Sequence, residues 1–253
     1  MANASAASHA VAVLQLLARQ AEPLPAATIA RRIGLPRSST YHLLGVLRES
    51  GFVSHLADDR VWGLGVAAYE LGAAYTRAAP LQRVARPILA RLADETGHNV
   101  HLAVLHGTDV LYVIEDRAPG RPSLVTDVGV RLPAPLTASG LAILAALPGR
   151  QVRALFPSRD LFVQRTGVGP TSLTALRSEL ARVRQRGHAV EDGSVTLGLS
   201  SVAVVVLDHT DHPVASVAIT FPSDDPDGTA VRHRLVDAAG RTAAELSHRI
   251  GRR

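Results

Sequence analysis

The pattern of residues 25–64 constrains the fold more than any other part of the sequence. Residues 25–34 (PAATIARRIG) have an apolar face at helical spacing and end at a glycine. Residues 35–51 (LPRSSTYHLLGVLRESG) have a proline as their second residue, show the same spacing and also end at a glycine, which are signals for the start and stop of a helix. Residues 52–64 (FVSHLADDRVWGL) place two apolar pairs around a polar turn, as a hairpin requires. The order helix, turn, helix, hairpin predicts a winged helix-turn-helix over residues 1–65.

The second of these helices presents polar side chains in its first two turns. Leu43, Leu44 and Leu47, with Thr40 one turn earlier, form its apolar face. In a helix-turn-helix the second helix enters the major groove with its N-terminus first, so that arginine reaches guanine and hydroxyl groups hold phosphates. The predicted DNA-contacting residues are Arg37, Ser38, Ser39, Tyr41 and His42 on the helix and Arg60 at the turn of the hairpin.

The same periodicity also fits two other structures. A plain three-helix bundle with an attached hairpin gives this pattern, and some winged helices bind proteins instead of DNA. Residues 1–65 carry six arginines against four acidic residues, so their charge does not decide between these possibilities. Over the whole chain the net charge is +5 and all 27 basic residues are arginine. The planar guanidinium suits phosphate and guanine, but a GC-rich genome gives the same bias.

Composition excludes several classes of protein. With 253 residues, 47% of them apolar, the chain is long enough for one or two domains. It has no cysteine, which excludes disulfides and thiolate metal sites. The N-terminus lacks the features of a signal peptide, and no stretch is long and apolar enough to cross a membrane. We therefore expect a soluble, cytoplasmic protein with no membrane partner.

Beyond residue 65 the sequence predicts a linker and a second domain of mixed α+β type. Residues 66–79 form an alanine-rich linker helix, and Pro80 marks the start of a domain over residues 80–253. Alternating apolar residues predict strands on both sides of the turn 107–109, at 123–128, and most clearly at 201–208 and 214–221. Helical spacing predicts helices at 81–97, with a kink or break at Pro87, and at 137–147, 171–186 and 228–250.

No catalytic or metal-binding set can be defended from the residues. His98, His101 and His106 have spacings of three and five, which place neighbouring histidines on opposite faces of a strand, so they do not predict a shared metal. The sequence contains no nucleophile motif, no phosphate-binding loop and no complete dinucleotide motif. We expect no catalytic residues, no metal and no cofactor. The competing hypothesis is a small-molecule enzyme in which residues 80–253 carry the activity and the winged helix is an interaction module.

Three segments resemble IclR-type bacterial transcription regulators. IARRIGLPRSSTYHLLGVLRESGFV resembles their DNA-binding segment, and VGVRLPAPLTASGLAILAAL resembles the loop and helix over their effector pocket. GHAVEDGSVTLGLSSVAVVVLD, followed by HPVASVAITFP, resembles their pocket strands. The segments occur in the family's order and span about residues 10–222.

The resemblance implies a winged helix that binds double-stranded operator DNA, a linker helix and a GAF-like effector-binding domain with an antiparallel sheet. It also implies a homodimer or a dimer-of-dimers tetramer, and control by a small organic acid. Family members often repress operons for the breakdown of such compounds. A regulator of this kind is not an enzyme.

The resemblance also implies the residues of an effector pocket. The loop at Thr137–Gly140 offers backbone amides to a carboxylate, and the acidic position is Glu191 or Asp192. Ser201 stands where the family frequently has cysteine, and Ala218 and Thr220 stand where it has two serines. These departures favour a larger or partly apolar acid, such as an aromatic one. The predicted effector-binding residues are Leu132, Thr137, Ala138, Ser139, Gly140, Leu141, Glu191, Ser201, Ala218 and Thr220.

Overall fold

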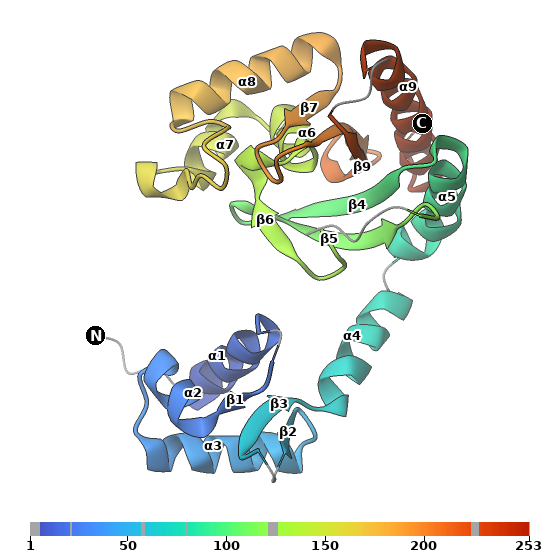
Figure 1. Cartoon of the computed structure of the whole chain (residues 1–253). Coiled ribbons are helices and arrows are strands. Elements are labelled where there is room, and N and C mark those ends of the chain that lie inside the picture. Colours follow the sequence, from blue (N-terminus) through green and yellow to red (C-terminus); the bar gives the residue numbers. More distant parts are fainter. Residues whose placement is uncertain are drawn as a thin grey trace. The chain divides into compact units, whose positions relative to one another are not determined.

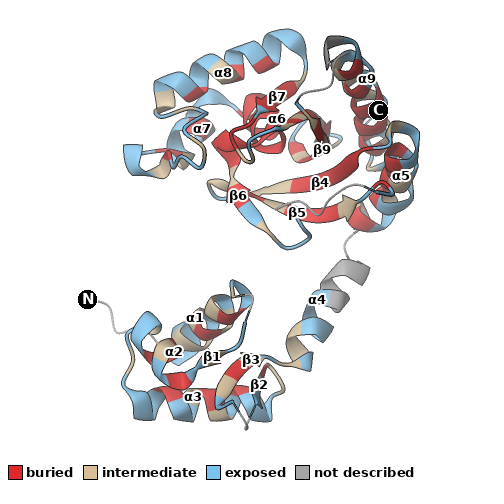
Figure 2. Ribbon diagram, in the orientation of Figure 1, coloured by how far each residue is buried: buried red, intermediate tan, exposed pale blue. Residues whose placement is uncertain are grey.

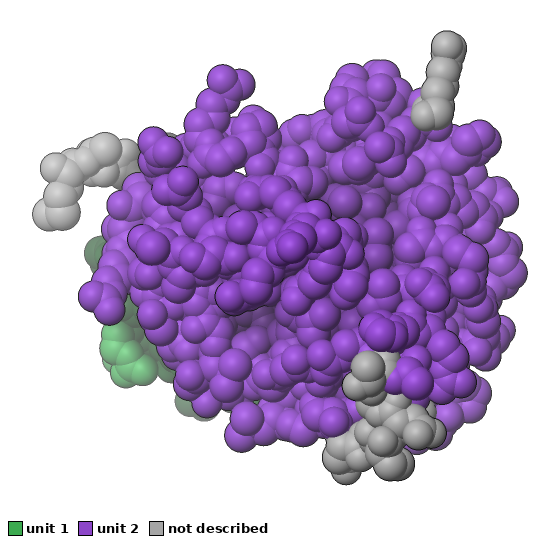
Figure 3. All heavy atoms as spheres, turned by 90° about the horizontal axis from the view of Figure 1, so that it is seen from above, with its two compact units in different colours: residues 1–79 green, residues 80–253 purple. Residues whose placement is uncertain are grey.

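The chain folds into two units, residues 1–79 and 80–253, which Figure 3 colours separately. The structure is a computed structural model that describes residues 6–20, 22–56, 59–78, 80–120, 126–223 and 228–252. Within these residues, no helix is both long and apolar enough to span a membrane.

The first unit is a winged helix-turn-helix, which confirms the predicted fold (Figure 1). Its strands form a three-stranded antiparallel sheet in the order β1-β3-β2. Buried side chains from three helices and the hairpin, among them Val13, Ile29, Leu44 and Trp62, make its core. The elements are α1 (Ala6–Ala18), β1 (Leu24–Pro25), α2 (Ala26–Ile33), α3 (Arg37–Glu49), β2 (Val53–Leu56), β3 (Val61–Leu64) and α4 (Val66–Ala78).

Glycines make the sharp changes of direction in this unit. Gly34 ends α2 in the left-handed conformation, with φ of 72°, where a glycine avoids the clash of a side chain. Gly65 lies so close to the start of β2 that a Cβ atom there would overlap the carbonyl oxygen of Gly51. That close approach lets α4 begin directly beside the hairpin.

The second unit is a six-stranded antiparallel sheet covered by helices on both faces. The strand order is β6-β5-β4-β9-β8-β7. Helices α5 and α9 pack on one face, and α6, α7 and α8 belong to the core on the other face. Figure 2 shows the buried residues concentrated in the sheet and on the inner sides of these helices. The strands are β4 (Asn99–His106), β5 (Asp109–Asp116), β6 (Arg131–Pro133), β7 (Ala189–Asp192), β8 (Leu199–Leu207) and β9 (Pro213–Pro222), and the helices are α5 (Pro80–Thr96), η1 (Ala134–Leu136), α6 (Ala138–Ala146), α7 (Gly149–Leu155), η2 (Arg159–Leu161), α8 (Leu173–Arg186) and α9 (Gly228–Arg249).

The structure does not contain the strand expected at residues 123–128 in the part of it that is described. Residues 123–125 lie outside the described residues, and 126–128 form turns and irregular backbone. The third strand of this part of the sheet is β6 instead. Gly129 and Val130 exchange backbone hydrogen bonds with Tyr112, and this pairing aligns the following residues with the start of β5, where Leu132 lies opposite Val110.

Of the kink or break expected at Pro87, the break is wrong, because α5 continues through the proline. Pro87 is exposed, so the helical carbonyl that loses its donor lies on the solvent side, where water can satisfy it. The neighbouring Ala85, Ile88 and Leu89 are buried in the core. Their burial holds the helix together across the proline.

Candidate functional site

Helix α3 divides into a buried face and an exposed face. Thr40, Leu44 and Leu47 are buried in the core of the first unit, and the Thr40 hydroxyl donates to the carbonyl of Pro36 at 3.0 Å. The residues predicted to contact DNA lie on the exposed side of the first two turns, and Tyr41 has 57% of its surface exposed. These exposed residues are Arg37, Ser38, Ser39, Tyr41 and His42.

Arg60 lies at the turn of the hairpin that forms the wing. It is exposed and has a left-handed backbone, with φ of 54°. The rings of His55 and Trp62, which face each other across the two strands, lie 4.4 Å apart and help to hold the wing against the core. The wing thus presents Arg60 at its tip.

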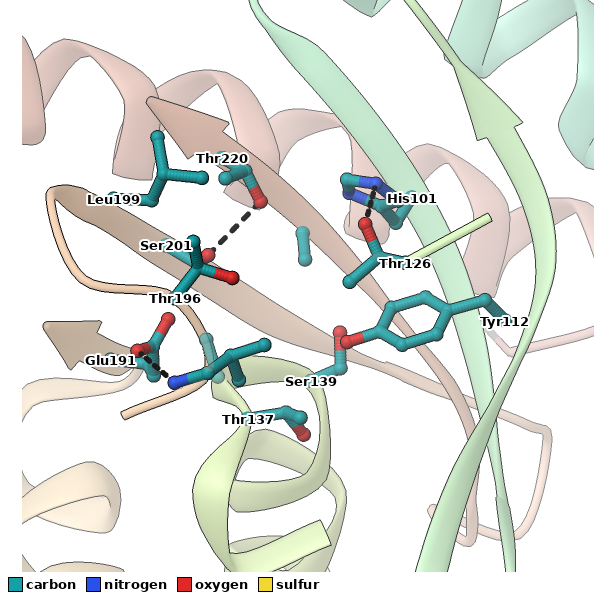
Figure 4. A pocket seen from close by; sticks show the side chains of 13 residues that line it. His101, Tyr112, Thr126, Thr137, Ser139, Glu191, Thr196, Leu199, Ser201 and Thr220 are labelled. Atoms are coloured by element: carbon teal, nitrogen blue, oxygen red, sulfur yellow. Dashed lines mark hydrogen bonds between the residues drawn. The ribbon is translucent and has the colours of Figure 1, made fainter. Parts of the chain in front are cut away.

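The second unit contains a buried pocket between α6 and the sheet (Figure 4). Seven of the ten predicted effector-binding residues meet there: Thr137, Ala138, Ser139, Glu191, Ser201, Ala218 and Thr220. They come from the start of α6 and from three neighbouring strands, β7, β8 and β9. Segments that are far apart in the sequence are therefore brought to one cavity.

Three predicted effector-binding residues do not line this pocket. Leu132 lies on β6, at the far edge of the sheet from β9, and packs in the core beneath α6. Leu141 faces a different cavity, next to α8. Gly140 allows a close approach of two backbone segments, because a Cβ atom at this position would overlap the carbonyl oxygen of Ala134. Glycine is needed so that α6 can start against the preceding 3-10 turn.

The start of α6 offers unbonded polar groups to the pocket. The Thr137 side chain caps the helix by accepting from the amide of Gly140 at 2.9 Å. Helix geometry leaves the amides of Ala138 and Ser139 without an acceptor inside the helix. The Ser139 hydroxyl is buried and forms no hydrogen bond with good geometry to any described residue. These groups can bind an anion.

Glu191 is the only acidic side chain that lines the pocket among the described residues. It lies on β7 itself, a strand that the sequence did not predict. One carboxylate oxygen accepts from the amide of Ser194 at 2.6 Å, from the Ser194 hydroxyl at 3.0 Å and from the amide of Val195 at 3.2 Å. Burial nevertheless raises the pKa of Glu191. This carboxyl group can accept a hydrogen bond from a hydroxyl group of a ligand.

Ser201 and Thr220 form the wall next to Glu191. They lie opposite each other on β8 and β9, and their hydroxyl groups are 3.0 Å apart in a hydrogen bond. Ala218 lies two residues before Thr220 and contributes a methyl group. This wall is polar at one end and apolar at the other.

The opposite wall contains three residues that the sequence did not predict: His101, Tyr112 and Thr126. The His101 ring nitrogen Nε2 lies 2.8 Å from the Thr126 hydroxyl. Figure 4 shows the Tyr112 hydroxyl pointing toward Ser139, and burial raises the pKa of Tyr112 above its usual range. Val195, Thr196 and Leu199, also not predicted, complete the lining.

His101 is electrically neutral in this wall. Burial, and then the positive charge of Arg117, lower its pKa to about 3. Glu115 lies 3.9 Å from the His101 ring, but its carboxylate is already engaged by Arg117 at 2.9 Å and 3.0 Å. The pocket lining therefore contains no cationic side chain among the described residues, and an anion would depend on amides and hydroxyl groups.

Family models account for most of the chain. The model described as "IclR helix-turn-helix domain" matches residues 6–57, and the model described as "Bacterial transcriptional regulator IclR C-terminal" matches residues 73–248. The chain belongs to the IclR family of bacterial transcriptional regulators. As a member of this family it is a DNA-binding transcription regulator and not an enzyme.

Individual relatives agree with this assignment. The transcriptional repressor IclR of Escherichia coli K12 is 30% identical over 198 residues, which are 77% of this chain and 71% of the relative. An IclR transcriptional regulator from Alicyclobacillus acidocaldarius has a solved structure with a TM-score of 0.85 and 26% identity, covering 97% of this chain and 98% of its own. An IclR homologue from Microbacterium hydrocarbonoxydans, solved in complex with 4-hydroxybenzoate, has the same fold, with a TM-score of 0.83, 22% identity and coverage of 96% and 98%.

The pocket of this IclR-family chain is narrow. Its free volume is about 20 Å³, enough for about one ordered water molecule. A ligand larger than water must therefore displace the side chains around it. Among the described residues, no three His, Cys, Asp or Glu side chains are grouped so that they could hold a metal ion. His98, His101 and His106 therefore do not form such a group.

The neutral His101 predicts a dependence of stability on pH. Its folded-state pKa of about 3 lies below the ordinary value of 6.5, so the unfolded chain takes up a proton first as the pH falls. The contribution of the neutral His101 to the free energy of unfolding is therefore lost as the pH falls below 6.5. Between pH 7 and pH 5 we expect the loss to be about 2 kcal/mol.

His101→Gln isolates this contribution, because glutamine does not titrate. Urea unfolding of both proteins at pH 7 and pH 5 measures it. The wild-type chain should lose about 2 kcal/mol more than the variant on acidification. Equal losses in the two proteins would contradict a neutral, buried His101.

Adding a single methyl group at Gly140 is expected to lower the free energy of unfolding of the second unit. Gly140→Ala places a Cβ atom against the backbone of Ala134, and relieving this overlap should cost about 1–3 kcal/mol of the free energy of unfolding. Gly240→Ala is the matched control, because nothing lies within 4 Å of an added Cβ in the middle of α9. The control should equal or exceed the wild-type melting temperature. A Gly140→Ala protein as stable as the control would show that α6 can shift freely.

Proposed function

We propose that the protein represses transcription from an operator that it binds through α3, and that a small organic acid bound in the second unit controls this binding. The observation that carries the effector half is the pocket itself. It is lined by the start of α6, where helix geometry leaves the amides of Ala138 and Ser139 without an acceptor inside the helix, and by the buried Ser139 hydroxyl, which has no hydrogen bond with good geometry. Such a cluster costs free energy unless a ligand satisfies it.

The DNA half rests on the exposed face of α3. The first two turns of this helix carry the guanidinium of Arg37, the hydroxyls of Ser38 and Ser39, and the side chains of Tyr41 and His42, all of which are exposed. These groups suit base edges and phosphates in a major groove. Arg60 at the tip of the wing suits the adjacent backbone or minor groove.

A carboxylic acid is the ligand class that fits the pocket. Its carboxylate would accept hydrogen bonds from the amides of Ala138 and Ser139. Glu191 would accept from a hydroxyl group of the ligand, while Ala218 and Leu199 would contact an apolar part. The Microbacterium protein of the same fold holds 4-hydroxybenzoate, which has a carboxylate, a hydroxyl group and a ring. A hydroxylated aromatic acid is therefore a candidate, provided that the narrow pocket widens around it.

Repression also calls for two DNA-binding units. A homodimer, or a dimer of dimers, would read two half-sites about 34 Å or a multiple of that apart. The E. coli relative is a repressor, which favours repression over activation here. Ligand binding would then change operator affinity by a coupling free energy of typically about 1–3 kcal/mol.

A two-step experiment tests the proposal. First, melting temperatures are measured with a panel of acids of increasing size, from glyoxylate and pyruvate to benzoate and 4-hydroxybenzoate, with the matching amides as uncharged controls. An acid that raises the melting temperature while its amide does not supports the carboxylate site. Second, gel shifts with the intergenic DNA upstream of the protein's own gene test whether that acid releases the complex. Binding of the DNA with no response to any stabilising acid would contradict effector control.

A further inference from the structure

One wall of the effector pocket has no role in the proposed mode of binding. Tyr112 lies on β5, lines the pocket and is buried. Figure 4 shows its hydroxyl group directed at Ser139, at the start of α6. A buried hydroxyl group lowers stability unless it has hydrogen-bond partners, and phenylalanine would fill nearly the same space without that cost. The hydroxyl group of Tyr112 therefore requires an explanation that packing alone does not give.

The Tyr112 side chain is held in place from two sides. Its backbone amide donates to the carbonyl of Val130 at 3.1 Å, and its carbonyl accepts from the amide of Gly129 at 2.9 Å. Its ring packs edge-on against the His101 ring, with 5.4 Å between the ring centres. The Thr126 hydroxyl, 2.8 Å from His101 Nε2, holds that second ring in turn. The hydroxyl group of Tyr112 is thus presented to the pocket at a fixed place, as a preorganised binding group should be.

The Tyr112 hydroxyl group keeps its proton and can act as a donor. Burial raises the pKa of Tyr112 above its usual range, and the negative charge of Glu191 acts in the same direction. The neighbouring hydroxyl groups of Ser139 and Thr137 act against this rise in pKa but do not cancel it. At neutral pH the phenol is therefore uncharged and has one proton to donate.

The start of α6 adds further donors beside Tyr112. The Thr137 hydroxyl is already engaged, because it accepts from the amide of Gly140 at 2.9 Å and donates to a backbone carbonyl at 3.4 Å. The Ser139 hydroxyl is buried and makes no hydrogen bond with good geometry to a described residue. The amides of Ala138 and Ser139 have no acceptor inside the helix. Two hydroxyl groups and two amides thus have protons to donate at this end of the pocket.

We propose that Tyr112 donates a hydrogen bond to the carboxylate of the effector and makes the pocket selective for an acid over the matching uncharged amide. This assignment rests on the proposed function, because it adds a specificity-determining residue to the same pocket. A carboxylate offers about four lone-pair directions on its two oxygen atoms, which suits the two hydroxyl groups and two amides. The NH₂ group of an amide would instead face these donors and leave some of them without an acceptor.

The position of Tyr112 also sets the direction of the ligand. Figure 4 shows Tyr112 and Ser139 on one side of the pocket and Glu191 and Ser201 on the other. The donor side binds the carboxylate, and Glu191 is the acceptor on the opposite side. The ligand class is therefore an acid that carries a hydroxyl or amino group at a distance from its carboxylate.

Isothermal titration calorimetry of the full-length protein tests the role of Tyr112. The probes are glyoxylate, pyruvate, benzoate and 4-hydroxybenzoate, each with its matching amide. Tyr112→Phe should weaken binding of the acid that the wild-type protein binds best about tenfold or more, which is the effect of losing a hydrogen bond to a charged group. Binding of the matching amide should not weaken, so the preference for the acid should fall. Tyr69→Phe, at an exposed tyrosine of α4, is the matched control and should bind the acid as the wild-type protein does.

Two further measurements distinguish a binding role from a structural one. Without ligand, Tyr112→Phe should have a melting temperature equal to or above that of the wild-type protein, because the hydroxyl group serves the ligand and not the fold. In protein that contains 3-fluorotyrosine at all four tyrosines, the fluorine-19 resonance that Tyr112→Phe lacks belongs to Tyr112. That resonance should shift when the binding acid is added. This second measurement needs no substitution in the protein that binds the acid.

Three results would overturn the role of Tyr112. Equal affinity of Tyr112→Phe and the wild-type protein for the acid would show that the carboxylate does not meet Tyr112, while the proposed function would stand. A lower melting temperature of ligand-free Tyr112→Phe, with unchanged acid affinity, would assign the hydroxyl group to support of α6. Binding of none of the four acids by the wild-type protein would overturn this role together with the proposed carboxylate site.

Discussion

Arg37→Ala is expected to weaken operator binding by about 1–3 kcal/mol, which is roughly five- to 150-fold. The guanidinium of Arg37 lies on the exposed face of the first turn of α3, where a helix that enters a major groove meets the bases. Alanine removes both a bidentate donor to guanine and a positive charge close to phosphates. Because the side chain supports no core contact, the fold of the first unit should remain intact.

Arg48→Ala is the matched control for this variant. Arg48 is an exposed arginine in the last turn of the same helix, so its removal changes the net charge equally but leaves the first turns untouched. Fluorescence anisotropy over a range of salt concentrations separates the two. Arg37→Ala should also reduce the dependence of log K on log salt by about one ion for each lost phosphate contact. Unchanged operator affinity would argue that α3 does not read the DNA.

Ala138→Leu is expected to lower effector affinity at least tenfold and to leave operator binding in the absence of effector intact. Ala138 is 2% exposed and lines a pocket with only about 20 Å³ of free volume. The added leucine atoms occupy the space in front of the helix amides. Overpacking should also cost about 1–3 kcal/mol of the stability of the second unit, and the first unit has its own core.

Ala146→Leu controls for the substitution itself. Ala146 is the last residue of the same helix and is exposed, so a leucine there should not affect the pocket. Thermal shifts with a stabilising acid and gel shifts without it give the two readouts. Ala138→Leu should abolish the thermal shift while its gel shift matches that of the control. Loss of DNA binding together with the acid response would contradict two separate sites.

The long periodic elements could be predicted from the sequence, because their local patterns agree with their final packing. The stripe that contains Thr40, Leu44 and Leu47 fixes both the existence of α3 and the face that it buries. Strands β8 and β9 are equally clear, since each is a long run of apolar residues bounded by turns. In these elements, local preference and tertiary burial point to the same structure.

The short strands could not be predicted, because they depend on pairing with distant residues. β1 has two residues and forms only because Leu24 meets Trp62 on β3. β6 and β7 have three and four residues, too few for a periodic signal. Pro87 gave the opposite error: the local rule predicts a break, but burial of the flanking residues on α5 overrides it.

The candidate pocket was predictable on one side only. The Thr137 loop and the Ser201 strand resemble family segments, so their residues could be placed together. His101 could have been found from the period-two pattern of β4, where it shares the helix-facing side with Ala103. Thr126 lies in a turn outside the regular elements, and only the folded structure shows that it meets His101.

Both ends of the six-stranded sheet resist further growth. β6, at one end, has three residues and finishes at Pro133, which has no amide hydrogen to donate to another strand. β7, at the other end, has four residues, finishes at the acidic pair Glu191 and Asp192, and is followed by Gly193 with φ of 74°. Short, interrupted and charged borders discourage edge-to-edge aggregation. Copies of this protein should therefore associate through helices and loops and not through a continuous β-sheet.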